Sequence, residues 1–83
     1  MSATTILNPK YVVQRLNTKE PDDVHVEYYT TYMAGDEEKG AFTKYVIDCM
    51  IFSSIKSAAR VAKDEVAEIR ILVSDADMKE FGR

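Results

Sequence analysis

One segment, residues 52–73, constrains the fold of this chain more than any other. Ser53 and Ser54 can cap a helix, because a hydroxyl accepts a hydrogen bond from an unpaired N–H of the first turn. An apolar stripe with helical spacing follows, made of Ile55, Ala58, Ala59 and Ala62. The pattern predicts an amphipathic helix that ends near residues 63–65. Residues 66–73 then alternate, which predicts a strand with its inner side formed by Ala67, Ile69, Ile71 and Val73.

Three earlier segments have the composition of strands, which is rich in β-branched and aromatic residues. They span residues 11–16, 24–33 and 42–52. Between the last two, the acidic segment 34–40 is bracketed by glycines and predicts a hairpin loop longer than the commonest types. Residues 42–52 are apolar on both sides, which indicates a central strand or a strand whose outer face is covered by a partner.

These elements predict a single α+β domain of order β-β-β-α-β, with a mostly antiparallel four-stranded sheet and one helix on one face. A chain of 83 residues is too short for a second core. Residues 1–9 are expected to form a polar leader and residues 75–83 a tail. For residues 74–81, one short capped helical turn and a frayed end are both open.

No catalytic or metal-binding constellation is present in the sequence. One cysteine and one histidine exclude an internal disulfide and a Cys/His zinc site. Cys49 lies mid-strand and is predicted to be a buried small hydrophobe. His25 and Glu27 share a strand face, but no nucleophile accompanies them, so a surface pair is favoured over an acid–base pair. We therefore expect a protein that is not an enzyme and uses no cofactor or metal.

The start of the sequence lacks the basic residues and apolar run of a signal peptide. No apolar stretch reaches the roughly 18–20 residues that cross a bilayer. Together with the single cysteine, these features predict a cytoplasmic location and no membrane partner.

A core this small often needs a partner for further stability, and tyrosine and methionine are enriched at protein interfaces. The apolar candidates for contact with a larger protein are Tyr29, Met33, Phe42 and Met50. The acidic candidates are Asp36, Glu37 and Glu38, which could approach a basic cleft such as that of a nucleic-acid-processing machine. A solvated turn is the simpler interpretation of these carboxylates. A second copy of the chain is an additional candidate partner.

A short basic stripe on the predicted helix supports an alternative function. Lys56, Arg60 and Lys63 fall at i, i+4 and i+7 and could contact the phosphates of a nucleic acid. The net charge of −3 and the lack of a recognised nucleic-acid motif favour a solvated helix face instead.

Segment 52–73 resembles the strand–helix–strand half of small phage-encoded inhibitor proteins. The residues that carry this resemblance are the two serines, the three alanines of the helix, and the alternating Ile69, Ile71 and Val73. Some anti-CRISPR proteins and the small phage inhibitor of bacterial RNA polymerase belong to this group. The resemblance covers about the C-terminal third of the chain and rests on architectural residues. It implies inhibition of a host protein by surface occlusion, without catalysis.

Overall fold

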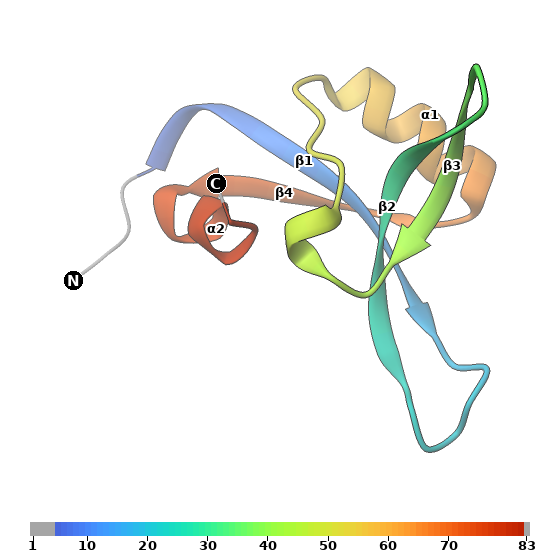
Figure 1. Cartoon of the computed structure of the whole chain (residues 1–83). Coiled ribbons are helices and arrows are strands. Elements are labelled where there is room, and N and C mark those ends of the chain that lie inside the picture. Colours follow the sequence, from blue (N-terminus) through green and yellow to red (C-terminus); the bar gives the residue numbers. More distant parts are fainter. Residues whose placement is uncertain (1–4, 83) are drawn as a thin grey trace.

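Within residues 5–82, which the computed structural model describes, four antiparallel strands form one sheet in the order β3-β2-β1-β4 (Figure 1). Side chains are described for residues 8–82. The strands are β1 (Thr5–Asn17), β2 (His25–Ala34), β3 (Glu37–Thr43) and β4 (Glu68–Ser74). The helices are α1 (Ile55–Glu65), α2 (Asp75–Glu80) and a short 3-10 turn, η1 (Val46–Asp48). The predicted α+β class and the β-β-β-α-β order are confirmed, with α2 added after β4.

The predicted third strand is wrong in its bounds, because the chain leaves the sheet after Thr43. It returns as residues 49–52, here called the wedge segment. Phe52 pairs with Tyr11 of β1 through two backbone hydrogen bonds of 2.9 and 2.8 Å. The Met50 N–H donates to the carbonyl of Tyr29 in β2 at 2.9 Å. Pairing between β1 and β2 stops at Gln14 and Tyr28, so the wedge segment joins the two strands where they separate.

The hairpin loop between β2 and β3 is shorter than predicted. Ala34 pairs with Glu37, which leaves a turn of two residues, Gly35 and Asp36. Gly35 has φ 68°, and a positive φ at the first turn position is the requirement of the type II′ hairpin turn. Glu37, Glu38 and Gly40 therefore belong to β3.

One core lies between the sheet and α1. Its buried members are Val13, Phe52, Ala58 and Ala62, with Tyr11, Tyr29, Val61, Ala67 and Ile69 packed around them. Small alanine side chains allow the helix to approach the sheet closely. The predicted packing of Ile55 and Ala59 is wrong, since Ile55 is 51% exposed and Ala59 is exposed. The buried side of the helix is instead formed by Ala58 and Ala62, with Val61 packed beside them.

A second core, which the sequence did not predict, lies on the opposite face of the sheet. It contains Val12, Cys49, Leu72 and Phe81, with Tyr28, Val46, Ile51 and Met78 packed against it. Val12 and Val13 are adjacent in β1 and therefore point to opposite faces. On the α2 face of β4, Leu72 is fully buried. On the other face, Ile71 and Val73 remain about half exposed, because α1 lies mainly over β1. The expected inner side of this strand is thus only partly correct. Cys49 is buried, as predicted.

The two ends of the chain differ from the expected leader and tail. β1 begins at Thr5, inside the expected leader, while residues 1–4 and Arg83 lie outside the described residues. Residues 75–80 form α2, so the helical alternative is the observed one. The Ser74 hydroxyl accepts a hydrogen bond from the Asp77 N–H at 3.2 Å and caps this helix. Phe81 then packs edge-on against Tyr28, with a centroid separation of 5.3 Å.

Phe81→Ala tests whether this C-terminal residue is an essential part of the second core. Because Phe81 is fully buried, we expect a loss of about 3–5 kcal/mol in the free energy of unfolding, measured by urea denaturation. Lys79→Ala, on the exposed side of α2, is the control and should change stability by less than about 0.5 kcal/mol. Equal free energies of unfolding of the two variants would contradict the role of Phe81 in the second core.

Val66→Gly tests the end of α1. Val66 adopts the left-handed conformation, with φ 53° and ψ 55°, and is 90% exposed. This conformation costs a residue with a Cβ about 1–2 kcal/mol, which glycine avoids. Allowing for the greater entropy of glycine in the unfolded chain, we expect thermal and urea unfolding to show a gain of about 0.5–1 kcal/mol. Val66→Ala retains the Cβ and should gain less; equal gains would contradict the explanation.

Candidate protein-interaction surface

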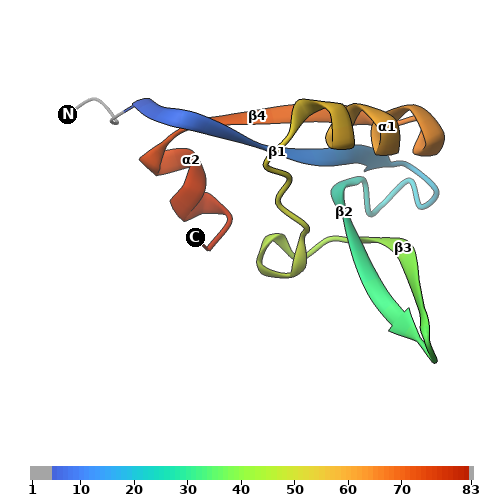
Figure 2. The same cartoon turned by 90° about the horizontal axis from the view of Figure 1, so that it is seen from above.

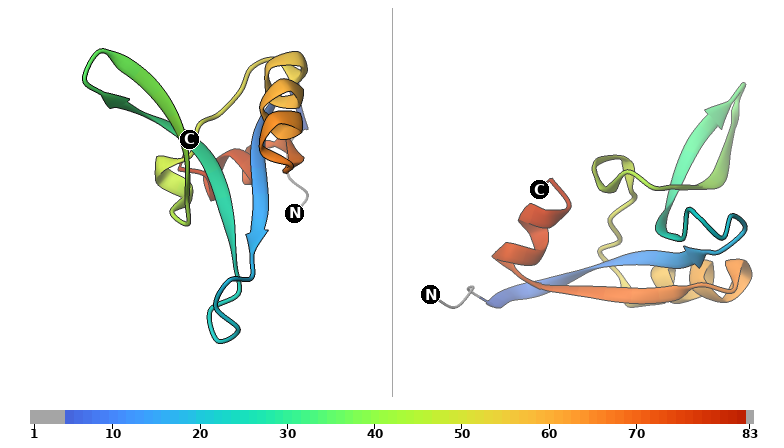
Figure 3. Two further views of the ribbon diagram at one scale, coloured as in Figure 1. Left: turned by 90° about the vertical axis from the view of Figure 1, so that its right-hand side faces the viewer. Right: turned by 90° about the horizontal axis from the view of Figure 1, so that it is seen from below.

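The outer part of the β2–β3 hairpin, residues 29–42, stands away from the rest of the molecule and is here called the arm. It begins where β2 leaves β1 and ends at the Gly35–Asp36 turn. Figure 2 shows the arm projecting from the β1–β4 pair, and the left panel of Figure 3 shows it diverging from α1. The wedge segment makes this divergence necessary, because it occupies the place beside Tyr29 that β1 would otherwise take.

Tyr29 anchors the arm to the core. Its ring lies edge-on to Phe42 of β3, with centroids 5.7 Å apart, and 6.2 Å from the ring of Phe52. A Cβ on Gly40 would approach a ring carbon of Tyr29 to 2.8 Å, so the ring fits over β3 only because residue 40 is glycine. The aromatic ring thus covers the glycine and joins both strands of the arm.

Carboxylates from two elements surround Tyr29. Burial raises the pKa of its hydroxyl, and the negative charges of Glu65, Glu38 and Asp64 raise it further. Glu38 belongs to β3, whereas Asp64 and Glu65 end α1. Negative charges from the arm and from the end of α1 therefore both act on the Tyr29 hydroxyl.

The tip of the arm combines apolar and acidic side chains. Met33 is 62% exposed and lies directly opposite Glu38, on the same face as Tyr29. Tyr32 is 50% exposed and points to the other face, which it shares with Glu37 and with Lys39, its direct cross-strand partner. Asp36 occupies the turn between them. Exposed apolar side chains among carboxylates are a suitable composition for contact with a basic protein surface.

The structure brings four predicted contact residues together at the tip and places the others nearer the body. The four are Met33, Asp36, Glu37 and Glu38. Phe42 is half-buried, and the Arg15 guanidinium lies 3.7 Å from the centre of its ring, so Phe42 supports the arm rather than offering a free surface. Met50 is 37% exposed and lies beside the base of the arm, where its N–H bonds to Tyr29.

Sequence reasoning missed three residues of this surface. Tyr32 is not among the contact residues that the sequence predicts. Asp64 and Glu65 enter that prediction only as part of the end of the helix. The acidic ending itself was a usable signal, because carboxylates are unfavourable at a helix C-terminus and their presence there points to another role.

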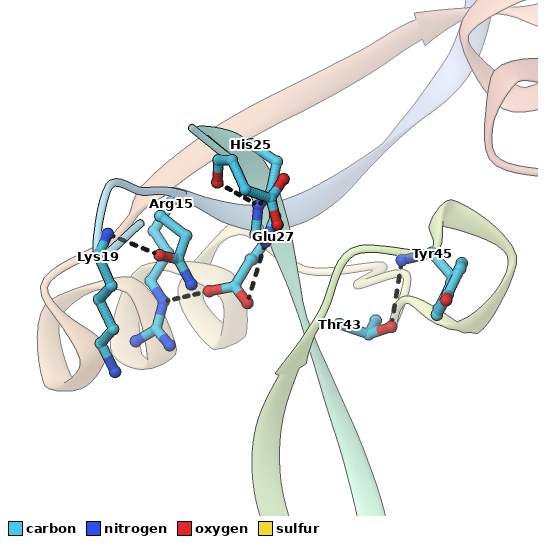
Figure 4. Close-up of polar contacts among 8 residues, drawn as sticks. Arg15, Lys19, His25, Glu27, Thr43 and Tyr45 are labelled. Carbon is cyan, nitrogen blue, oxygen red and sulfur yellow. Dashed lines mark hydrogen bonds and ion pairs between the residues drawn. The ribbon is translucent and has the colours of Figure 1, made fainter. Parts of the chain in front are cut away.

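A polar cluster lies at the opposite end of β2 (Figure 4). The Arg15 Nε donates to Glu27 at 3.3 Å. The His25 ring is 3.6 Å from Glu27 and 3.4 Å from the Asp23 carboxylate. Burial acts to raise the pKa of Glu27, but hydrogen bonds from Asn17 and Arg15 outweigh it and hold the pKa below its ordinary value. An ionised carboxylate with a lowered pKa is a weak base, so the cluster is better suited to joining β1 and β2 than to proton transfer.

The surroundings of this cluster agree with a structural role. An open hollow of about 270 Å³ lies beside it, lined by Arg15, Leu16, Asn17, Thr18, Lys19 and Glu27. Among the described residues, no group of three or more His, Cys, Asp or Glu side chains could hold a metal ion.

The predicted basic stripe lies on the outer side of α1, away from Ala58 and Ala62. Lys56, Arg60 and Lys63 are all exposed, and none of them forms an ion pair with another residue in the range 5–82. Asp64 and Glu65 follow directly and reduce the positive charge at the end of the helix.

Comparison of the chain with protein-family models, with curated proteins and with solved structures found no match. No helix in residues 5–82 has the length and apolar character needed to span a membrane. The resemblance to phage inhibitors and the expected cytoplasmic location remain predictions.

Glu27→Gln tests the role of the polar cluster. Because the pKa of Glu27 is lower in the folded protein, its charge stabilises the fold above about pH 4.5, and this contribution is lost as the pH falls through the folded-state pKa. At pH about 7 we expect the free energy of unfolding of the variant to be lower than that of the wild type by up to about 1 kcal/mol, and this difference should decrease at acidic pH. Urea unfolding of both proteins at neutral and acidic pH measures the difference, and Glu20→Gln, in the exposed loop, is the control. A difference independent of pH would exclude the charge as its cause.

Proposed function

We propose that this protein is a non-catalytic binding domain that docks its arm on a basic surface of a larger protein. The observation that carries the proposal is the tip of the arm, where exposed Tyr32 and Met33 lie among Asp36, Glu37 and Glu38. Exposed apolar side chains on a projecting hairpin gain free energy when a partner covers them. Three carboxylates outweigh the single cation Lys39, which lies opposite Tyr32, and this negative charge favours a basic partner.

Rigidity supports this function. The turn is only two residues long, and Tyr29, Phe42 and Phe52 fix the base of the arm to the core. A preformed arm loses little conformational entropy on binding, which favours affinity. Asp64 and Glu65, at the end of α1, add negative charge that acts on Tyr29 together with that of Glu38.

The partner class that we propose is a nucleic-acid-processing protein with a basic groove. Carboxylates on a narrow hairpin can occupy a groove that normally receives phosphates, because both present negative charge. Occlusion of this kind inhibits without catalysis, which is also what the resemblance to phage inhibitors implies.

The test compares two variants of the full chain in affinity purification from its natural host, with quantitative mass spectrometry. Met33→Thr/Glu38→Lys alters the tip at one cross-strand pair, and Lys56→Glu/Arg60→Glu alters the outer side of α1. We expect at least one host protein whose recovery falls about tenfold or more with the first variant only. Circular dichroism checks that both variants are folded. Equal recovery with the wild-type chain and the tip variant would contradict the proposal.

The alternative function, nucleic-acid binding, rests on the exposed and unpaired cations of α1. Titration of a fluorescent oligonucleotide at low salt tests it directly. If the chain binds, and Lys56→Glu/Arg60→Glu abolishes binding while the tip variant does not, the alternative replaces our proposal. We expect no binding, because the chain carries a net charge of −3.

A further inference from the structure

The outer edge of β4 is a second surface of the sheet, at the side opposite the arm. β4 pairs with β1 on one side, and within residues 5–82 no strand pairs with its other side. The N–H and C=O of Tyr11 both bond to Phe52 and so point away from β4. Since these directions alternate along a strand, Arg70 and Leu72 direct their backbone groups toward β1, and Ile69 and Ile71 direct theirs outward.

Two contacts limit the length of this free edge. At one end, the Ala67 N–H donates to the carbonyl of Ala62 at 2.8 Å. At the other end, the Val73 N–H donates to the Asp77 carboxylate at 3.0 Å. Between them, the outward backbone groups of Ile69 and Ile71 have no partner among the described residues. The free edge is therefore short and runs from Ala67 to Ile71.

Exposed apolar side chains accompany this edge. Ile71 is 49% exposed, and Val66, where α1 turns into β4, is 90% exposed. Val66 also has a positive φ that glycine would adopt at lower cost. A valine that is both exposed and unfavourable for the fold is an independent sign that another molecule covers this place.

We propose that a second copy of this chain pairs with β4 in an antiparallel manner, with a twofold axis at Ile69. Within its own chain, the Arg70 guanidinium donates to both carboxylate oxygens of Glu80, at 3.1 and 2.6 Å. This alignment sets Glu68 of one copy directly opposite Arg70 of the other, twice by symmetry, so that Glu68 would join this ion pair. The free groups can then form four backbone hydrogen bonds, two between the Ile69 residues and two from Ile71 N–H to the opposing Ala67 carbonyl. Val66 of each copy would lie beside the exposed Ile71 of the other.

The charges favour this alignment among those that the edge permits. An axis at Arg70 would place two arginines opposite each other, each paired with Glu80 of its own chain, and would give no new opposite-charge pair. An axis at Ile71 would place Arg70 opposite Leu72 and Glu68 opposite Ser74, without charge complementarity. The short edge is thus complementary to itself in one register.

The dimer leaves both arms free, because β3 and β4 are the two opposite edges of the sheet. Its existence does not depend on the proposed function of the arm. The paired edge is short, so we expect a weak dimer with a dissociation constant of about 10–100 µM.

Sedimentation equilibrium of the wild-type chain and of Ile71→Pro tests the proposal. The Ile71 N–H points outward, so proline removes no hydrogen bond within the chain but eliminates two of the four across the dimer. We expect the dissociation constant of the dimer to rise at least about tenfold. Ile47→Ser, at an exposed isoleucine of η1, is the control and should dimerise as the wild type does. A wild-type chain that is monomeric at about 1 mM, or an Ile71→Pro variant that dimerises normally, would overturn the proposal.

Two milder variants keep the test decisive if circular dichroism shows that Ile71→Pro is unfolded. Val66→Gly should weaken the dimer severalfold although the monomer is not destabilised, a combination that a purely structural role of Val66 does not produce. Glu68→Lys, at an exposed position, should also weaken it severalfold by placing lysine opposite arginine. Unchanged dimerisation in both variants would overturn the proposed interface.

Discussion

The pairing of Phe52 with Tyr11 is the interaction on which the rest of the structure depends. Its two backbone hydrogen bonds place the wedge segment beside β1, and the bond from Met50 to Tyr29 attaches the same segment to β2. Side chains alternate along this extended segment, so Phe52 enters the core under α1 while Cys49 and Ile51 enter the core under α2. Four residues thus connect two strands and both cores.

Two small cores stabilise this sheet in place of one larger core. Each has only four buried residues, and each is closed by a helix or by a residue that follows a helix. A domain of this size has little stability to spare. The fold consequently relies on close contacts, such as alanines of α1 against β1 and the edge-on packing of Phe81 against Tyr28.

The wedge segment also determines which surfaces are available for binding. By separating β1 from β2, it directs the β2–β3 hairpin away from the body and creates the arm. The position of α1 over β1 leaves the outer half of β4 uncovered, with Ile71 and Val73 about half exposed. The two surfaces that we propose for binding therefore lie at opposite edges of one sheet, and both follow from the way in which the middle of the sheet is filled.

Local patterns in the sequence were sufficient for the parts of the fold that depend on neighbouring residues. The spacing of apolar residues predicted α1, and alternation predicted β2 and β4, because these signals arise within a few residues. Ser54 is the N-cap of α1, but the predicted hydrogen bond to its side chain is absent from the part of the chain that the structure describes. The same reasoning placed four candidate contact residues near one hairpin tip, since a hairpin brings its two strands together by itself. The apolar residues on both sides of residues 42–52 indicated a central strand or one whose outer face a partner covers, and Cys49, Ile51 and Phe52 do enter two different cores.

Only the tertiary structure decided where the third strand ends and which faces are covered. Nothing within residues 42–52 distinguishes a continuous strand from a strand, a turn and a wedge, because the distinction depends on Tyr11, more than 30 residues earlier in the chain. The second core likewise depends on Phe81 reaching Tyr28 across the sheet. The sequence by itself determined the elements and their order; the long-range contacts determined how far each extends, which side it buries and which edge it leaves free.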